Sequence, residues 1–305
     1  MREPSRPTTD PATETFLAHR NLLFTVAYEL LGSAADAEDV LQETWLRWAD
    51  VDLATVRERR AYLVRITTRQ ALSRLRTLRR RRESYVGPWL PEPLLTAPDV
   101  ADDVELAESV SMAMLLVMET LAPTERAVFV LREVFDLAYD EIAAAVGKRP
   151  DAVRQIAHRA RAHVSARRPR GAVSPGETHG VLAAFRRAVE TGDVSGLLGV
   201  LAPDVVLLTD GGGVVRAATA PVAGAGTVAA VLGRIPAAAE LRPVRVNGFP
   251  ALVVLLDGTI DTVLAVRIDD GLVTGLYAVR NPDKLSRLER ETAVSRGFPL
   301  PPRAQ

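Results

Sequence analysis

The stretch Asp36-Ala37-Glu38-Asp39-Val40-Leu41-Gln42-Glu43-Thr44-Trp45 is the most informative part of this 305-residue chain. Its acids fall in the first turns of a helix that begins after Ser33, where the helix dipole favours negative charge. Capping alone would explain them. Further along, a short helix ends at Gly147, in the left-handed position, and Pro150 opens another helix that contains Arg154-Gln155-Ile156-Ala157-His158-Arg159-Ala160-Arg161. The two patterns together are more specific than either alone.

Length and composition limit the classes of protein that fit. The chain is long enough for about two or three domains, and 48% hydrophobic residues can build packed cores. No apolar run approaches the length that spans a bilayer, and residues 1–10 lack the apolar core of a signal peptide, so we expect a cytoplasmic protein. Without cysteine, and with four scattered histidines, the sequence predicts no disulfide, metal or cofactor.

Charge is distributed in blocks although the formal net charge is zero. Residues 57–82 hold eleven arginines and one acid, residues 83–141 thirteen acids and two arginines, and residues 148–170 eight bases and one acid. Neutralising DNA phosphates releases counterions and adds affinity, so two basic blocks suit contact with DNA at two places. Solvated helix faces would explain either block taken alone.

The first half of the chain is expected to be helical. Apolar spacing predicts a helix over residues 15–31, stopped by Gly32, a second directly after it, and a third over residues 59–78 with its arginines outward. Three prolines within Tyr85–Leu95 favour an extended linker. Because Trp89 is unusual in solvent, we expect the linker to dock on a groove, although an ordinary ordered loop fits equally well.

The segment after the linker ends in a helix-turn-helix pattern. Helices are expected over residues 104–119, 123–134 and 139–146, followed by the helix that begins at Pro150. On that last helix, apolar side chains share one face and polar side chains point away, which is the arrangement that enters a major groove. A generic corner between two helices has the same geometry.

Together, residues 15–165 resemble an extracytoplasmic-function (ECF) sigma factor of the sigma-70 superfamily. The resemblance implies that the acidic helix binds the beta-prime clamp of core RNA polymerase, and that the basic helix after it reads and opens the minus-10 promoter element. The helix-turn-helix would be region 4, which reads the minus-35 element and touches the beta flap. Ser73 stands where the family commonly has an acid, which leaves the detail of the promoter-facing surface open.

The resemblance assigns three groups of residues. The RNA polymerase contacts are Asp36, Glu38, Asp39, Gln42 and Glu43. The minus-10 contacts are Trp48, Arg57, Arg59, Arg60, Tyr62, Arg65, Arg69, Arg74 and Arg76. The minus-35 contacts are Arg149, Arg154, Gln155, His158, Arg159 and Arg161. Aromatic and guanidinium planes of the minus-10 group suit stacking on extruded bases.

The last part of the chain has its own pattern. Strand-like runs with Asp-Gly turn signals follow two helices, at 179–190 and 194–201. The strand-like runs cover residues 205–208, 241–246, 251–256, 260–268 and 272–279. A helix is expected between the first two runs, over residues 227–234. Helices and a curved antiparallel sheet that encloses a pocket resemble a SnoaL-like domain of the nuclear-transport-factor-2 (NTF2) superfamily.

The expected fold class is therefore multidomain, with an all-α sigma region 2 and a helix-turn-helix sigma region 4 followed by an α+β NTF2-like cone. The expected boundaries are 14–82 for region 2, 83–103 for the linker with its Trp-Leu-Pro-Glu-Pro segment, 104–168 for region 4, 178–285 for the SnoaL-like regulatory domain and 286–305 for a C-terminal tail.

Three short segments resemble the sigma-factor subgroup that carries this extension, the sigma factor J type. They are Trp89-Leu90-Pro91-Glu92-Pro93, Asp210-Gly211-Gly212-Gly213 and Asn281-Pro282-Asp283-Lys284. The resemblance implies that they form a regulatory contact through which the extension controls the sigma core in cis. The subgroup usually continues the glycine run with lysine where this chain has Val214, which leaves Lys284 as the one lysine of the domain. Turn formation alone would explain the second and third segments.

Two other classes of function fit parts of the sequence. A one-component DNA-binding regulator with a ligand pocket would leave residues 36–43 without a role. A SnoaL-like cyclase or isomerase fused to a DNA-binding module would need a proton shuttle, yet no histidine follows Gly180, and Asp204, Asp210 and Asp261 have no evident partner. We therefore expect no enzyme. The expected partners are core RNA polymerase, promoter DNA and an unidentified small molecule or protein at the SnoaL-like domain, with no membrane.

Overall fold

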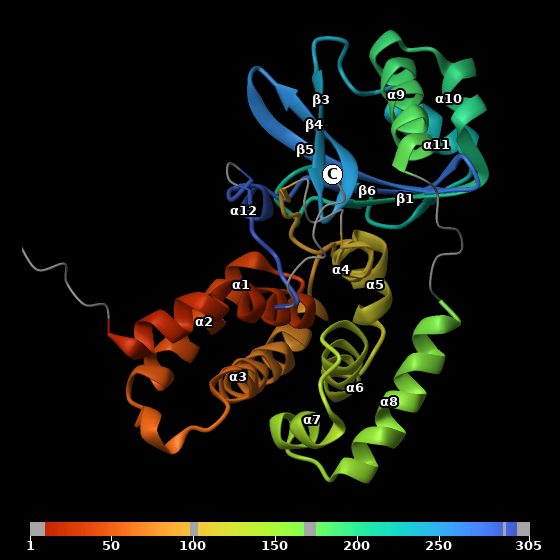
Figure 1. Cartoon of the computed structure of the whole chain (residues 1–305). Helices are drawn as coiled ribbons and strands as arrows, with labels where there is room; N and C mark the ends of the chain where they lie inside the picture. The colour runs from red at the N-terminus through yellow and green to blue at the C-terminus, as the bar shows by residue number, and fades with distance from the viewer. Residues whose placement is uncertain (1–9, 98–102, 168–174, 289–290, 298–305) are drawn as a thin grey trace, which may run out of the picture.

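The computed structural model describes residues 10–97, 103–167, 175–288 and 291–297. Two helical regions lie side by side, and a domain built on a six-stranded sheet lies across them (Figure 1). Parts of the expected linker, the end of region 4 and much of the expected tail lie outside the described residues. Within the described ranges, no helix has the length and apolar character needed to cross a membrane.

The first helical region confirms the expected helices. It contains α1 (Pro11–Leu31), α2 (Ala34–Ala49), the short η1 (Leu53–Thr55) and α3 (Arg59–Arg82). Gly32 ends α1 with a φ of 65°, a left-handed conformation that costs glycine little. Ser33 then begins α2, because its hydroxyl accepts a hydrogen bond from the backbone N–H of Asp36.

The second helical region differs from expectation at one point. It contains α4 (Val104–Val110), α5 (Met112–Glu119), α6 (Pro123–Phe129), its wider continuation η3 (Val130–Val134), α7 (Tyr139–Val146) and α8 (Pro150–Ser165). The prediction of one helix over residues 104–119 is wrong. Ser111 adopts a ψ of 148° and caps α5 through a hydrogen bond from the backbone N–H of Met114, so the chain turns there. Gly147, with a φ of 68°, joins α7 to α8 as predicted.

The two helical regions share one apolar core. Leu23 of α1 and Leu75 of α3 belong to the same contiguous cluster of buried side chains as Leu131 of η3 and Val153 of α8. Burial of apolar surface is the main source of stability in such a cluster. The two regions are therefore packed against each other, with α3 lying along α7.

The C-terminal domain is an α+β domain, as expected. Its sheet has the order β2-β1-β6-β5-β4-β3. The elements are α9 (Pro175–Thr191), α10 (Val194–Val200), β1 (Leu201–Asp210), β2 (Val222–Ala223), α11 (Ala225–Leu232), β3 (Glu240–Val246), β4 (Phe249–Leu256), β5 (Thr259–Asp269), β6 (Leu272–Val279) and α12 (Pro282–Leu285). The expectation of an antiparallel sheet holds for four of the five strand pairs and fails for the fifth, because β1 pairs with β6 in parallel. The chain runs from β1 to its antiparallel partner β2, and then through α11 to β3 at the opposite edge of the sheet.

Both faces of this sheet are covered. Leu252 and Val254 of β4 belong to a cluster with side chains of α9, α10 and α11, such as Phe185. Alternate residues of the same strand, such as Val253, join a cluster that includes Leu90 of the linker, together with Met112 of α5 and side chains near α12. Because successive side chains of a strand point to opposite faces, the second face of the sheet packs on the linker and the helical regions.

Candidate DNA-reading surfaces and interdomain contact

The residues expected to bind polymerase lie on α2. They are Asp36, Glu38, Asp39, Gln42 and Glu43. Arg74 of α3 bridges Asp36 and Asp39, with nitrogen-to-oxygen distances of 2.7 Å to each carboxylate. Arg20 of α1 pairs with Glu38 at 2.7 Å. These ion pairs orient one end of the acidic surface, while Gln42 and Glu43 extend it as exposed side chains.

Trp48, which was expected to contact the minus-10 element, lies inside the core of the closed structure. Its side chain is fully buried, and its Nε1 donates a hydrogen bond to the carbonyl oxygen of Ala12 at 2.8 Å. Tyr62 packs against it with ring centroids 5.8 Å apart. Position 48 falls on the inner side of α2, so the indole contributes to the core and presents no face to a base.

Several of the other residues expected at the minus-10 element are engaged within the protein. The guanidinium of Arg65 lies 4.7 Å from the ring centroid of Tyr62. Arg59 donates to the Thr15 hydroxyl at 3.2 Å, and Arg60 is half-buried. Arg74 is the bridge to α2 described above, whereas Arg57 and Arg76 are exposed.

Arg69 connects the two helical regions. Its guanidinium donates hydrogen bonds to the carbonyl oxygens of Ala144, at 2.8 Å, and Ala145, at 3.4 Å, in the last turn of α7. The last carbonyl groups of a helix lack partners within the helix and carry partial negative charge, so an arginine is favourable there. A side chain expected to read DNA from α3 thus holds the first helix of the helix-turn-helix.

The residues expected at the minus-35 element present a different picture, since all six are exposed. They are Arg149, Arg154, Gln155, His158, Arg159 and Arg161. On the opposite side of α8, Val153 and Ala157 are buried in the core. Helix α7 and the beginning of α8 lie at the end of the molecule away from the sheet (Figure 1). The recognition face of α8 is therefore open to solvent.

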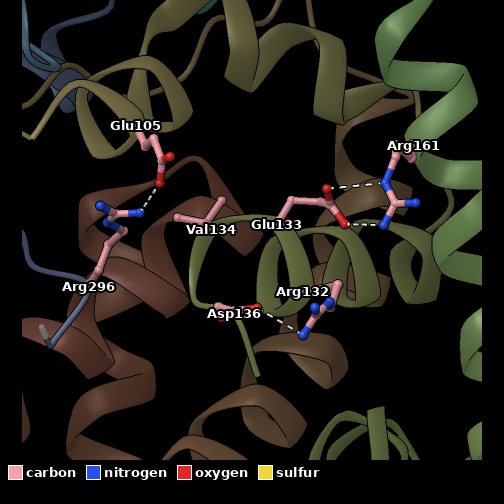
Figure 2. A pocket seen from close by; sticks show the side chains of 7 residues that line it. All are labelled: Glu105, Arg132, Glu133, Val134, Asp136, Arg161 and Arg296. Atoms are coloured by element: carbon pink, nitrogen blue, oxygen red, sulfur yellow. Dashed lines mark hydrogen bonds and ion pairs between the residues drawn. The ribbon is translucent and has the colours of Figure 1, made fainter. Parts of the chain in front are cut away.

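A charged pocket lies beside α8. Three ion pairs line it, namely Glu105 with Arg296, Glu133 with Arg161, and Asp136 with Arg132 (Figure 2). Its volume is about 410 Å³. Each of the arginines that line the pocket faces an acid, so their charges are balanced locally. The pairs connect α4, η3, α8 and residues 291–297.

The described part of the linker, up to residue 97, is extended and docked, as expected. Leu90 and Leu94 are buried, and Leu95 forms an isolated antiparallel bridge with Val246 of β3. This bridge extends the edge of the sheet by backbone pairing, as peptide ligands do when they add a strand to an exposed edge. The linker is therefore an integral part of the contact between domains.

Trp89 of the linker is in contact with two cations. The guanidinium of Arg82, at the end of α3, is 3.4 Å from its ring centroid, and the Nζ of Lys284 is 4.3 Å away. Cations favour the face of an indole ring. One aromatic side chain thus connects the first helical region to the segment Asn281–Lys284.

The carboxylate of Asp210, fully buried at the end of β1, joins the three segments predicted to form the regulatory contact. Its Oδ1 accepts hydrogen bonds from the Tyr85 hydroxyl at 2.6 Å and the Gly212 backbone N–H at 3.0 Å. Its Oδ2 accepts from the Leu90 backbone N–H at 2.8 Å and the Lys284 Nζ at 2.6 Å. Lys284 also donates to the carbonyl oxygen of Leu90 at 2.5 Å.

Burial determines the electrostatics of this cluster. It lowers the pKa of Lys284 to about 8, against the opposing attraction of Asp210. It also raises the pKa of Tyr85, and the hydrogen bond to Asp210 raises it further, so the phenol stays protonated as a donor. The arrangement is a buried charge pair in which the carboxylate also accepts hydrogen bonds from the linker and from the Gly212 backbone N–H.

Some of the other residues in the three segments lie inside the contact, and others are exposed to solvent. Gly212, with a φ of 64°, lies so close to Asn281 that a Cβ would be 2.4 Å from its Nδ2. That Nδ2 donates to the Tyr85 hydroxyl at 2.9 Å. Val214 is exposed, and so are Pro282 and Asp283, so these side chains lie at the edge of the contact.

Glu92 fixes the linker to the acidic helix. Its Oε2 accepts hydrogen bonds from the Ser33 hydroxyl and the Ala35 backbone N–H, both at 3.1 Å, and so caps α2. Its backbone N–H donates to the carbonyl oxygen of Gly32 at 2.8 Å, and its own carbonyl oxygen accepts from the Tyr28 hydroxyl at 2.7 Å. Burial raises the pKa of the Glu92 carboxyl.

The three acids considered above as proton shuttles are either paired with a basic side chain or exposed to solvent. Asp261 pairs with Arg280 at 2.8 Å, Asp210 pairs with Lys284, and Asp204 is exposed.

Asn247, which is buried where the sheet meets the linker, was not predicted from the sequence as a contact residue. A signal was present, because the β3–β4 turn is Asn-Gly whereas the two following hairpins have Asp-Gly.

The family follows from comparison with known proteins. The Sigma-70 region 2 model matches residues 15–81, and the Sigma-70, region 4 model matches residues 111–164. The chain is 34% identical over 288 residues to "ECF RNA polymerase sigma factor SigJ" of Mycobacterium tuberculosis (strain ATCC 25618 / H37Rv), covering 89% of this chain and 92% of the relative. The chain belongs to the ECF sigma factor family.

Further relatives cover the same length. "Probable ECF RNA polymerase sigma factor SigI" of Mycobacterium tuberculosis (strain CDC 1551 / Oshkosh) is 33% identical over 288 residues, covering 92% of this sigma factor and 97% of the relative. The crystal structure of M. tuberculosis SigJ superposes with a TM-score of 0.72 at 31% identity, covering 95% of this chain and 99% of that chain. The first helical region is thus sigma region 2 and the second contains region 4. The protein is an alternative sigma factor that directs transcription initiation.

Proposed function

We propose that the C-terminal domain of this ECF sigma factor regulates it in cis, by determining whether regions 2 and 4 can separate to bind core RNA polymerase and promoter DNA. The observation that carries this proposal is the buried Asp210 carboxylate, which binds the linker through Tyr85 and Leu90 and the C-terminal segment through Lys284. A linker held this way cannot also extend between two separated regions.

The assignment of surfaces forms part of the proposal. The acidic side of α2 binds the beta-prime clamp through Asp36, Glu38, Asp39, Gln42 and Glu43. Region 4 touches the beta flap, and the exposed face of α8 reads the minus-35 element. The arginines of α3 read the minus-10 element once Arg69 has left α7. Support comes from the exposure of α8 and from the contacts that now occupy α3.

The packed arrangement is then a low-activity state. The two regions share a core, so an extended sigma factor requires that this core be opened. The apparent affinity for polymerase falls as the fraction of closed molecules rises. Any small molecule or protein that favours the undocked C-terminal domain therefore raises this affinity.

In vitro transcription with core RNA polymerase tests this proposal. Asp210→Asn weakens the buried pair, and Tyr85→Phe removes one hydrogen bond without removing the ring. Asp261→Asn is the matched control, because Asp261 pairs with Arg280 inside the same domain. We expect the first two variants to raise promoter-specific transcripts by about fivefold or more, a common size of coupling between sites, and the control to match the wild type.

Two results would contradict the proposal. Unchanged transcription by both Asp210→Asn and Tyr85→Phe would show that the contact does not regulate. Absence of transcripts and of core polymerase binding from every form of the chain would instead favour a one-component DNA-binding regulator.

A further inference from the structure

Three hairpin turns of the C-terminal sheet have nearly the same backbone. They are Asn247-Gly248 between β3 and β4, Asp257-Gly258 between β4 and β5, and Asp270-Gly271 between β5 and β6. In each turn both residues have positive φ, from 50° to 54° at the first position and from 74° to 79° at the second. This is the two-residue turn that matches the twist of paired strands and favours Asn-Gly or Asp-Gly. Local geometry therefore does not distinguish the three.

Their surroundings differ. A Cβ built on Gly258 or Gly271 would meet nothing within 4 Å. A Cβ on Gly248 would lie 2.8 Å from the Cα and Cβ of Ala107 in α4. The backbone N–H of Gly248 also donates to the Thr96 hydroxyl of the linker at 3.0 Å. Only the first turn is inserted against other parts of the molecule in the described structure.

Asn247 uses all of its side-chain hydrogen-bonding groups there. The residue is 1% exposed. Its Oδ1 accepts from the Leu94 backbone N–H at 3.0 Å, and its backbone N–H donates to the carbonyl oxygen of Leu94 at 2.9 Å. Its Nδ2 donates to the Tyr28 hydroxyl at 2.7 Å and to the carbonyl oxygen of Val110 at 2.8 Å. Aspartate has no donor for the last two partners, which explains asparagine at this turn.

The partners of Asn247 belong to three separate parts of the chain. Tyr28 lies in α1 of region 2, Leu94 in the linker and Val110 in α4, next to region 4. The Tyr28 hydroxyl continues the chain of bonds to the carbonyl oxygen of Glu92. A single buried amide thus satisfies polar groups that would be left unpaired if any one of the three parts moved away.

We propose that the Asn247-Gly248 turn is the docking element that keeps linker, region 2 and region 4 together, so that its withdrawal releases the sigma factor for polymerase. The proposal deepens, and rests on, the cis regulation proposed above. It assigns the release step to a turn outside the three segments that the sequence analysis singled out. Closing requires the amide of Asn247, because a buried carboxylate there would place an acceptor against the carbonyl oxygen of Val110 and would leave that oxygen without a donor.

The test exchanges the residues of two turns in the full chain. Asn247→Asp removes both donors, and Asp257→Asn is the reverse exchange at an exposed turn of the same geometry. Tyr28→Phe deletes one partner and preserves the packing of the ring, so it serves if Asn247→Asp fails to fold, as judged by circular dichroism. Affinity for core RNA polymerase is measured for each variant by fluorescence anisotropy of a labelled chain.

We expect Asn247→Asp and Tyr28→Phe to bind core polymerase about fivefold or more tightly than the wild type, with Asp257→Asn unchanged. Wild-type or weaker affinity in the first two variants would overturn the proposal. If Asp210→Asn still tightens binding in that case, cis regulation stands and only the role of the turn fails. If Asp210→Asn is also without effect, cis regulation itself fails.

Discussion

The two surfaces expected to read DNA differ in how many of their side chains already contact other parts of the protein. On α8 of region 4, the six residues expected to read DNA are exposed, although Arg154 pairs with Asp151 and Arg161 with Glu133. On α3 of region 2, Arg69 binds the end of α7, Arg74 bridges the acids of α2, and Arg82 stacks on Trp89. The closed arrangement therefore restrains region 2 while it leaves the recognition helix of region 4 accessible.

This difference suggests an order of events. Under the proposed assignment of surfaces, region 4 meets DNA without a change in the fold, whereas region 2 must first give up contacts with α7 and with the linker. Regulation in cis would then act mainly on minus-10 recognition and polymerase binding. The following predictions test each side of the comparison.

Trp48 gives the largest expected effect. Trp48→Ala should lower the free energy of unfolding by about 3–5 kcal/mol, because it removes a fully buried indole from the core. Urea denaturation measures this, and Leu46→Ala, at a side chain that is 65% exposed, is the control, expected within about 0.5 kcal/mol of the wild type. A stable Trp48→Ala protein that lost only promoter opening would return Trp48 to the DNA-reading surface.

A substitution of Arg159 tests the exposed surface of α8. Arg159→Ala should weaken promoter binding by about 1–3 kcal/mol if it reads a base edge, with little change in stability, since its side chain is exposed. Binding of the polymerase holoenzyme to promoter DNA provides the measurement. Arg187→Ala, at an exposed position in α9, controls for the loss of one charge. Equal losses for the two variants would argue for nonspecific electrostatics alone.

A substitution of Glu29 tests the contact between α1 and α4. Its Oε1 accepts a hydrogen bond from the Ser109 hydroxyl at 2.7 Å, and burial raises the pKa of its carboxyl to about 8, although Ser109, Arg126 and Arg296 oppose the shift. A carboxyl whose pKa is raised on folding stabilises the fold most below its unfolded value of 4.5, and this contribution is lost as the pH rises toward 8.

The free energy of unfolding should therefore fall by up to about 1.4 kcal/mol for each pH unit between pH 6 and pH 8 through Glu29 alone. Glu29→Gln should remove that component, so the variant gains stability relative to the wild type as the pH rises. Chemical denaturation of both proteins at several pH values isolates the difference. Parallel curves for the two proteins would mean that Glu29 is ionised in the fold.

Arg69 gives the smallest expected effect. Arg69→Ala should cost about 1 kcal/mol of stability, through the loss of hydrogen bonds to α7, and should speed amide exchange in the last turn of that helix. Arg76→Ala, on the same helix but exposed, should leave exchange in α7 unchanged. Equal exchange in both variants would mean that Arg69 does not restrain region 4.

Local signals predicted most of the elements correctly, while tertiary contacts decided the rest. The helix over residues 139–146 was predicted to the residue, because Gly147 and Pro150 punctuate it. The break at Ser111 was missed, since apolar spacing continues across it. Trp48 was assigned to DNA from its residue type and the family resemblance, whereas the face of α2 it occupies places it in the core. Asn247 looked like an ordinary turn residue, because what it binds lies far away in sequence.

Regulation in cis requires that the linker stays docked on β3 in the closed state, and a reversible covalent lock tests this directly. Leu95 and Val246 face each other in a bridge flanked by backbone hydrogen bonds from Asn247 to Leu94 and from Thr96 to Arg245. Cα atoms at such a position are about 4.5 Å apart, within the range of a disulfide. The natural chain has no cysteine, so the double variant Leu95→Cys, Val246→Cys introduces one possible bond.

The measurement is transcription by core RNA polymerase with this double variant, oxidised and then reduced. We expect the oxidised chain to fail to direct transcription, and reductant to restore wild-type output. Full activity of the oxidised chain, with the disulfide verified by mass spectrometry, would contradict the claim that undocking the linker is required.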